Sequence, residues 1–156
     1  MVSFESDILK IFFLSSFDAD RTVTFAKRCL SQVRRETKNS VSNEEAVVIA
    51  SPIIVKYWFL LRKSLDRHHR MSYPKAGFEF PEKIDFGPWR EFLLKARDEE
   101  ILAVLFLLVL KWPSAAVSEG LNASLGSLHT RVSRGLEWLI KVSDFASQPD
   151  FQRGPT

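Results

Sequence analysis

The 156-residue sequence has one cysteine, three histidines, six glycines and no long hydrophobic run. A single cysteine, Cys29, excludes an intramolecular disulfide framework and a cysteine-rich zinc module. The longest apolar run, Ile101–Leu110, falls well short of the ~20 residues that a membrane-spanning helix needs. The N-terminal segment lacks the positive charge and the apolar core of a secretory signal. We therefore expect a cytoplasmic protein without a membrane partner.

Sequence signatures of catalysis are absent as well. The chain has no glycine-rich phosphate loop, no nucleophile elbow and no paired acid–base motif. No base can be located beside Cys29, so a cysteine nucleophile is not expected. The adjacent His68 and His69 would point to different faces of a helix, which suits Zn²⁺ poorly. We expect a protein that is not an enzyme and that has no metal site and no cofactor.

The composition is that of a folded helical protein. Hydrophobic residues make up 46% of the chain and charged residues 26%, which excludes global disorder. The apolar residues recur at helical spacing nearly everywhere, and no Asn-Gly or Asp-Gly hairpin turn occurs. The pattern predicts an all-α fold. The net charge of +3, with its surplus in the first half of the chain, distinguishes no class of partner by itself.

The order of apolar stripes and polar breaks predicts two small helical domains. A segment rich in proline, glycine and aromatic residues separates them, and its aromatic content favours packing along a surface over a free tether. The expected boundaries are an N-terminal helical domain at 1–70, a linker at 71–88, a C-terminal domain at 89–146 and a frayed tail at 147–156.

The N-terminal domain is expected to hold three helices. Val23, Ala26, Leu30 and Val33 recur at steps of three and four, which predicts the buried stripe of the second helix. Cys29 lies beside that stripe and is expected in the core.

The third helix of this domain is unusually apolar. Ser42 followed by Glu45 matches a capping box at its start. Pro52 predicts a kink or a break inside it, because proline lacks a backbone donor. The basic and aromatic cluster of Lys56-Tyr57-Trp58 with Arg62-Lys63 is of a kind that can stack on an unpaired base. A domain interface is the simpler interpretation of the same cluster. Three consecutive aromatics, Tyr57 to Phe59, mean that at least one side chain must leave the core.

The region from Asp98 to Leu139 predicts a helix-turn-helix. A long apolar helix is followed by a short helix, a tight turn and a second amphipathic helix with basic residues on its open face. Asn122 can adopt the left-handed conformation that a sharp turn needs, and Ser124 can cap the second helix. Arg131 and Arg134 are three residues apart, so they are neighbours on one helix face.

This region resembles the C-terminal helix-turn-helix of bacterial RNA polymerase sigma factors of the extracytoplasmic-function type. The string that carries the resemblance is V-S-E-G-L-N-A-S-L-G-S-L-H-T-R-V-S-R-G-L, residues 117–136, which aligns without gaps. About 45 residues are covered when the preceding helix is included. The chain departs from the family pattern at Ser118, at Asn122 in place of the turn glycine, at His129 and at Gly135.

The resemblance implies a transcription initiator that binds double-stranded promoter DNA and core RNA polymerase, with an anti-sigma protein as a further partner. The residues that it assigns to DNA contact are Ser124, Ser127, His129, Thr130, Arg131 and Arg134. Residues 1–70 would correspond to the family's polymerase-binding and promoter-melting domain. The acidic core-binding motif of that domain would fall near Glu44-Glu45-Ala46, although its following Gln-Glu is absent.

Two alternatives stay open on the sequence. The missing core-binding motif favours a helix-turn-helix regulator that binds DNA and never engages polymerase. The near-neutral C-terminal half, and an apolar residue, Leu125, at the start of the second motif helix, favour a helical protein-interaction adaptor that has lost DNA binding. A solvated helix face is the simplest interpretation of Arg131 and Arg134 in that case.

Overall fold

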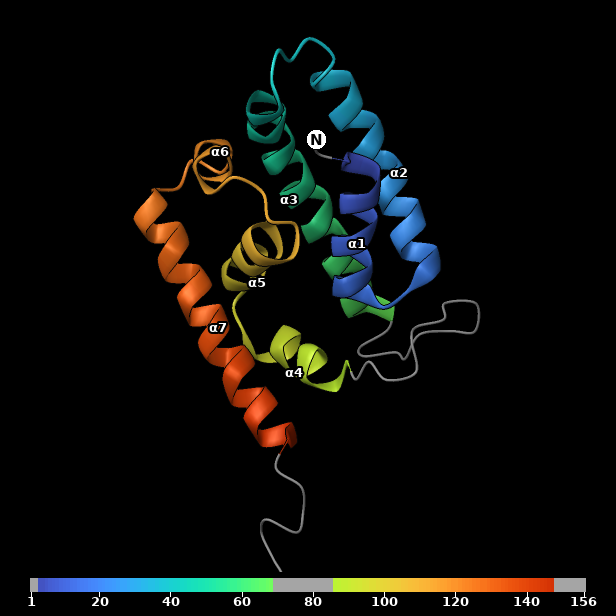
Figure 1. The fold of residues 1–156 in the computed structure, drawn as a ribbon. Coiled ribbons are helices and arrows are strands. Elements are labelled where there is room, and N and C mark those ends of the chain that lie inside the picture. Colours follow the sequence, from blue (N-terminus) through green and yellow to red (C-terminus); the bar gives the residue numbers. More distant parts are fainter. Residues whose placement is uncertain (1–2, 69–85, 148–156) are drawn as a thin grey trace, which may run out of the picture.

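The structure, a computed structural model, describes residues 3–68 and 86–147 (Figure 1). No β-strand occurs within these residues, which confirms the all-α class for the described part of the chain. The elements in chain order are α1 (Phe4–Ser16), α2 (Ala19–Glu36), α3 (Asn43–His68), α4 (Gly87–Lys95), α5 (Asp98–Val104), the π-helical segment η1 (Leu105–Val109), α6 (Ser114–Gly120) and α7 (Leu125–Ser147). None of the described helices is both long enough and apolar enough to span a bilayer.

The helix α2 packs against both α1 and α3. Its first turn is capped by Asp18, whose side chain accepts a hydrogen bond of 3.0 Å from the Arg21 amide. The residues that it buries are Thr22, Ala26, Cys29 and Val33. The predicted stripe was therefore wrong at Val23, which is 42% exposed. Because α2 packs against two helices, its buried face is directed between α1 and α3, and Val23 lies at the edge of that face.

The helix α3 continues through Pro52, so of the predicted kink or break, the break does not occur. Pro52 itself is exposed, and the preceding Ser51 is buried and donates a hydrogen bond of 2.7 Å to the Val47 carbonyl. The capping interaction predicted at the start of the helix is present, because the Glu45 amide donates to Ser42 Oγ at 3.1 Å. Proline removes one hydrogen bond from the helix, and its exposed ring does not pack into a neighbouring helix.

In the basic and aromatic cluster of α3, Trp58 is interior, Tyr57 and Arg62 are partly buried and both lysines are exposed. Trp58 is fully buried and its Nε1 donates to Ser15 Oγ at 2.7 Å. The Arg62 guanidinium lies 5.2 Å from the centre of the Trp58 ring. Phe59 is the aromatic side chain that leaves the core, at 45% exposure. Stacking on an unpaired base through Trp58 is therefore excluded in this conformation, and the packing interpretation of the cluster is the one that the structure supports.

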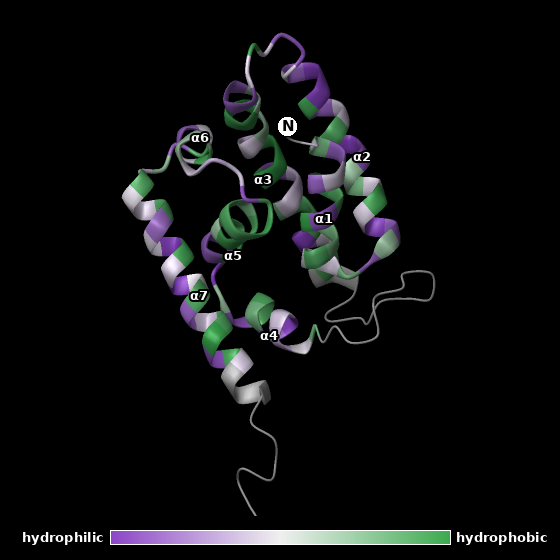
Figure 2. Cartoon of the chain, in the orientation of Figure 1, coloured by the Kyte–Doolittle hydropathy of each residue, from purple (hydrophilic) through white to green (hydrophobic). Residues whose placement is uncertain are grey.

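The helix α5 occupies the middle of the second half, between α7 and the N-terminal helices (Figure 1). Every residue from Ile101 to Phe106 is buried, and Figure 2 shows the coil labelled α5 mostly in the colour of hydrophobic residues. The helix then widens into η1, where the Leu110 amide donates to the Leu105 carbonyl at 2.9 Å. A helical segment that is buried on all sides has to be covered by neighbours, and α7 supplies part of that cover.

Three side-chain hydrogen bonds connect the helices before and after the expected linker. Trp112 Nε1 donates to Asp7 Oδ2 at 2.9 Å, and Trp89 Nε1 donates to the Leu14 carbonyl at 2.6 Å. Arg62 donates to the Leu93 carbonyl at 3.2 Å. The buried apolar residues of both halves form one cluster, and α6 packs directly on α3. The domain boundaries stay a prediction, but the described halves share a common core.

The expected linker and tail fall mostly outside the described residues. Positions 71–85 of the linker and 148–156 of the tail are not described. At the described end of the linker, the Phe86 ring packs edge-on against the Phe17 ring, with centroids 5.3 Å apart.

Candidate nucleic-acid interface

The segment between α6 and α7 forms a tight turn. Asn122 has φ 53°, the left-handed conformation that was predicted for it. Two hydrogen bonds close the turn between Ser118 and Ala123: the Ala123 amide donates to the Ser118 carbonyl at 3.0 Å, and Ser118 Oγ donates to the Ala123 carbonyl. Residues 114–140 are thus two helices joined by a fixed turn rather than one continuous rod.

The start of α7 is organised by Ser124. Its Oγ accepts a hydrogen bond of 3.0 Å from the Ser127 amide, as the sequence predicted for a capping serine. One turn later, Thr130 Oγ1 donates to the Gly126 carbonyl at 3.0 Å. Of these two hydroxyls, that of Thr130 uses its proton inside the helix, so toward an external partner it is an acceptor.

The candidate DNA-contacting side chains differ in exposure. Ser124, His129, Thr130 and Arg134 are exposed, whereas Ser127 and Arg131 are partly buried.

Arg131 is turned toward α5, and its Nε lies 3.9 Å from Glu99 Oε2. The side chain of Arg131 is 29% exposed. Arg134, one turn further along, is fully solvent-facing, and the exposed Glu137 follows it by three residues. The carboxylates of Glu99 and Glu137 therefore offset the two arginines, and this face is only weakly positive.

The helices α7 and α5 approach each other closely at Gly135, and this contact fixes the position of the α7 face that carries Arg131 and Arg134. Gly135 is buried, and a Cβ built at that position would lie 2.5 Å from Val104 Cγ2 and 3.3 Å from the Glu100 carbonyl oxygen. The sequence indicated Gly135 only as a departure from the pattern of the family that this region resembles. A glycine is needed there because of the contact with Val104, which lies 31 residues away in the chain, and no local sequence pattern indicates such a contact.

One side of α7 carries an exposed apolar stripe. Leu125 is 42% exposed, Leu136 39% and Ile140 58%. Leu128, on the neighbouring side of the helix, is fully buried. The buried positions Leu128, Gly135 and Val142 follow each other at steps of seven. The stripe of exposed residues lies beside them on the helix, at the edge of the contact with α5.

Within the described residues, no group of three histidine, cysteine, aspartate or glutamate side chains is close enough to hold a metal ion. Comparison of the chain with protein-family models, with curated proteins and with solved structures returned no match. The case for function therefore depends on the residues and geometry of the chain alone.

Proposed function

We propose that this chain is a sigma-factor-like transcription initiation protein, which binds promoter DNA through the N-terminal half of α7. The observation that carries the proposal is the geometry of α6, the Asn122 turn and α7. A short helix, a closed turn and a longer helix with a capped start and exposed polar side chains form the layout of a DNA-reading helix-turn-helix.

The side chains divide into two classes of expected contact. Ser124, Ser127, His129 and Thr130 occupy the first turns of α7, the part of such a helix that reaches base edges in the major groove. Arg134 lies further along and is the best placed to meet a phosphate. Arg131 joins them when its guanidinium leaves Glu99.

Polymerase binding is the part of the proposal that residues 1–70 would carry. Glu44 and Glu45 lie in the first turn of α3 and are both exposed, as a docking motif requires. They share a shallow groove with Pro113, Ala116 and Glu119, so the acidic start of α3 adjoins the helix-turn-helix. A regulator that binds DNA without polymerase is the alternative if this surface engages nothing.

Fluorescence anisotropy on a labelled random duplex at two salt concentrations tests DNA binding. Affinity should fall with salt, because phosphate contacts release counterions, and the Arg134→Ala variant should lower the slope of log K against log[salt] by about one. The matched control is Arg35→Ala, an exposed arginine on α2 at the other side of the molecule. An equal loss in both variants would show general charge attraction, and the assignment to α7 would then be wrong.

Co-purification with core RNA polymerase tests the rest of the proposal. Retention of the chain by core, weakened by the double variant Glu44→Lys with Glu45→Lys, supports an initiation factor. Salt-dependent duplex binding without retention supports the regulator instead.

The exposed apolar stripe at Leu125, Leu136 and Ile140 favours the second candidate function, a protein-interaction adaptor. Exposed aliphatic side chains along one face of a helix are typical of a surface that another protein covers. An adaptor should show no salt-dependent binding to any duplex.

A further inference from the structure

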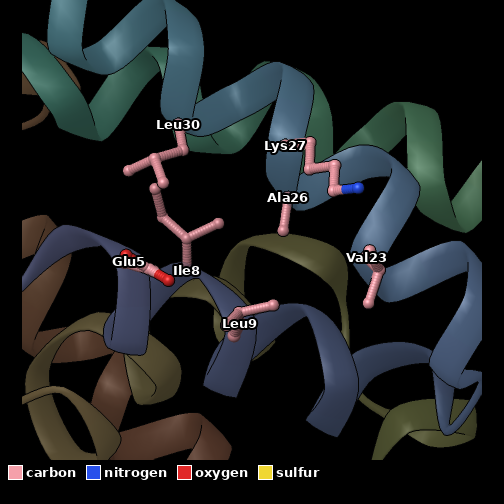
Figure 3. A pocket seen from close by; sticks show the side chains of 7 residues that line it. All are labelled: Glu5, Ile8, Leu9, Val23, Ala26, Lys27 and Leu30. Atoms are coloured by element: carbon pink, nitrogen blue, oxygen red, sulfur yellow. The ribbon is translucent and has the colours of Figure 1, made fainter.

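A groove lies between α1 and α2, and all of its lining residues belong to these two helices. Its volume is about 200 Å³. Five apolar residues line it, Ile8, Leu9, Val23, Ala26 and Leu30, together with Glu5 and Lys27 (Figure 3). Figure 3 shows Glu5 and Leu30 toward one end of the groove and Val23 toward the other. Leu9 is 36% exposed and Val23 is 42% exposed, so aliphatic surface in this groove is left open to solvent.

The α2 edge of the groove alternates apolar and basic residues. Val23, Lys27, Leu30 and Arg34 follow one another at steps of four, three and four, which places them along one edge of the helix. Further cations lie on the exposed side of α2, at Arg28 and Arg35. Glu5 is the only carboxylate in the lining, and it is already paired with Arg34 at 3.4 Å.

From this arrangement we propose that the α1–α2 groove docks an acidic amphipathic helix of a partner protein. Aliphatic side chains of that helix enter between Leu9 and Val23, and its carboxylates meet Lys27 and Arg34. The spacing of Lys27 and Arg34 is two helical turns, so carboxylates seven residues apart on the partner reach both. Within the described residues, Lys27 has no carboxylate partner, whereas Arg34 has to exchange Glu5 for the incoming acid.

The lining favours a protein helix over a nucleic acid. Single-stranded nucleic acids are held by aromatic side chains on which bases stack, and this groove contains only aliphatic ones. Duplex binding needs no apolar groove beside its cations. The inference is independent of DNA binding by α7, because every residue that lines the groove belongs to α1 or α2.

The test uses the full chain and a designed, fluorescently labelled helical peptide with leucines on one face and glutamates on its flanks. Two matched peptides accompany it, one with lysines in place of the glutamates and one with alanines in place of the leucines. Anisotropy should show binding of the acidic peptide at least about tenfold tighter than that of either control, because both the charge and the apolar face contribute. Equal binding of the acidic and lysine peptides would overturn the proposal.

Variants of the chain test whether the acidic peptide binds in the groove. Lys27→Glu should weaken binding of the acidic peptide about tenfold, since it places a like charge at the groove. Arg28→Glu is the matched control, with the same change of charge one residue away and outside the lining, and its effect should be several times smaller. Glu5→Gln should tighten binding, because it removes the competing partner of Arg34.

Two results contradict the proposal. Equal effects of Lys27→Glu and Arg28→Glu would show that the peptide follows the general charge of α2 rather than the groove. Binding of a single-stranded or duplex oligonucleotide that competes with the peptide and is lost in Lys27→Glu would assign the surface to nucleic acid instead. All of these positions are at least partly exposed, and circular dichroism of each variant verifies its folding.

Discussion

Gly120 in α6 lies directly against the backbone carbonyl of Val48 in α3. A Cβ built at Gly120 would be 2.5 Å from the Val48 oxygen. That carbonyl would ordinarily accept a hydrogen bond from the amide four residues later, and this residue is Pro52, which has no N–H. The proline thus leaves an oxygen without its helical donor at the place where α6 comes closest to α3. The glycine of one half and the proline of the other belong to the same contact.

Gly120→Ala should therefore destabilise the fold. The clashing atom is backbone and cannot rotate away, so α6 has to shift, and we expect a loss of about 1–3 kcal/mol in the free energy of unfolding. Urea denaturation followed by circular dichroism measures it. The control is Gly126→Ala, an exposed helical position where a Cβ meets none of the described atoms within 4 Å. It should stabilise by about 0.5–1 kcal/mol, since alanine is the better helix former. Equal effects at the two positions would contradict the close approach.

Gly135→Ala should destabilise through a different contact, with the Val104 side chain of α5. A valine in a helix has one strongly preferred rotamer, and Val104 is 1% exposed, so its methyl group cannot easily move. A loss of about 1–3 kcal/mol is expected for Gly135→Ala. The double variant with Val104→Ala should lose less than the sum of the two single losses, because the smaller side chain makes room. Strict additivity in urea denaturation would show that the two residues do not touch.

Gly120 and Gly135 show which features of the fold could be predicted from the sequence and which could not. Helical periodicity predicted most of the helices, and the turn at Asn122 and the cap at Ser124 were predicted because their causes are local. Gly120 and Gly135 could not be assigned a role, because the atoms that require them belong to other helices. Val23 shows the same dependence on other helices. Its apolar character fits the buried stripe of α2, but the packing of α2 against a second neighbour leaves this side chain exposed. The exposure of Arg134 and the pairing of Arg131 with Glu99 likewise depend on how α7 is rotated on α5.

Cys29 provides a test of the packing of α2. The side chain is fully buried, and this burial raises the pKa of its thiol from 9.0 to about 12, with the Lys56 ammonium opposing part of the rise. The thiolate is the reactive form, so a thiol reagent at pH 8 should leave the native protein unmodified and react once urea unfolds it. Rapid modification of the native chain would mean that α2 leaves its neighbours readily.

The same thiol makes stability depend on pH. The folded state keeps the proton over the range from about 9 to 12 in which the unfolded chain releases it. The folded state then binds more protons, so the free energy of unfolding falls as pH rises through that range, by up to about 1.4 kcal/mol per unit. Below pH 9 the contribution is constant. The Cys29→Ala variant should lack the part of the pH dependence that this thiol causes. Urea denaturation between pH 8 and 10 compares the slope of the free energy of unfolding against pH in the two proteins. Parallel slopes would show that Cys29 does not titrate differently in the two states.

If α7 is the helix that contacts DNA, Glu99 should weaken that binding. Its carboxylate lies 3.9 Å from the Arg131 guanidinium, and the Glu99 side chain is 49% exposed, so the pair is screened and weak. Glu99→Gln releases Arg131 and removes a charge that repels phosphate. We expect a two- to fivefold gain in affinity for a random duplex, about the energy of one exposed ion pair, measured by anisotropy at low salt.

Two comparisons decide whether that gain comes from Arg131. The gain should be smaller when Glu99→Gln is combined with Arg131→Ala, because the released guanidinium is then missing. Glu36→Gln, an exposed carboxylate on α2, makes the same change of net charge far from α7 and should produce less than a twofold gain. A gain that persists without Arg131 and is matched by Glu36→Gln would reflect net charge alone. In that case Arg131 is a structural partner of α5, and the contact with DNA would have to be carried by the exposed residues around Arg134.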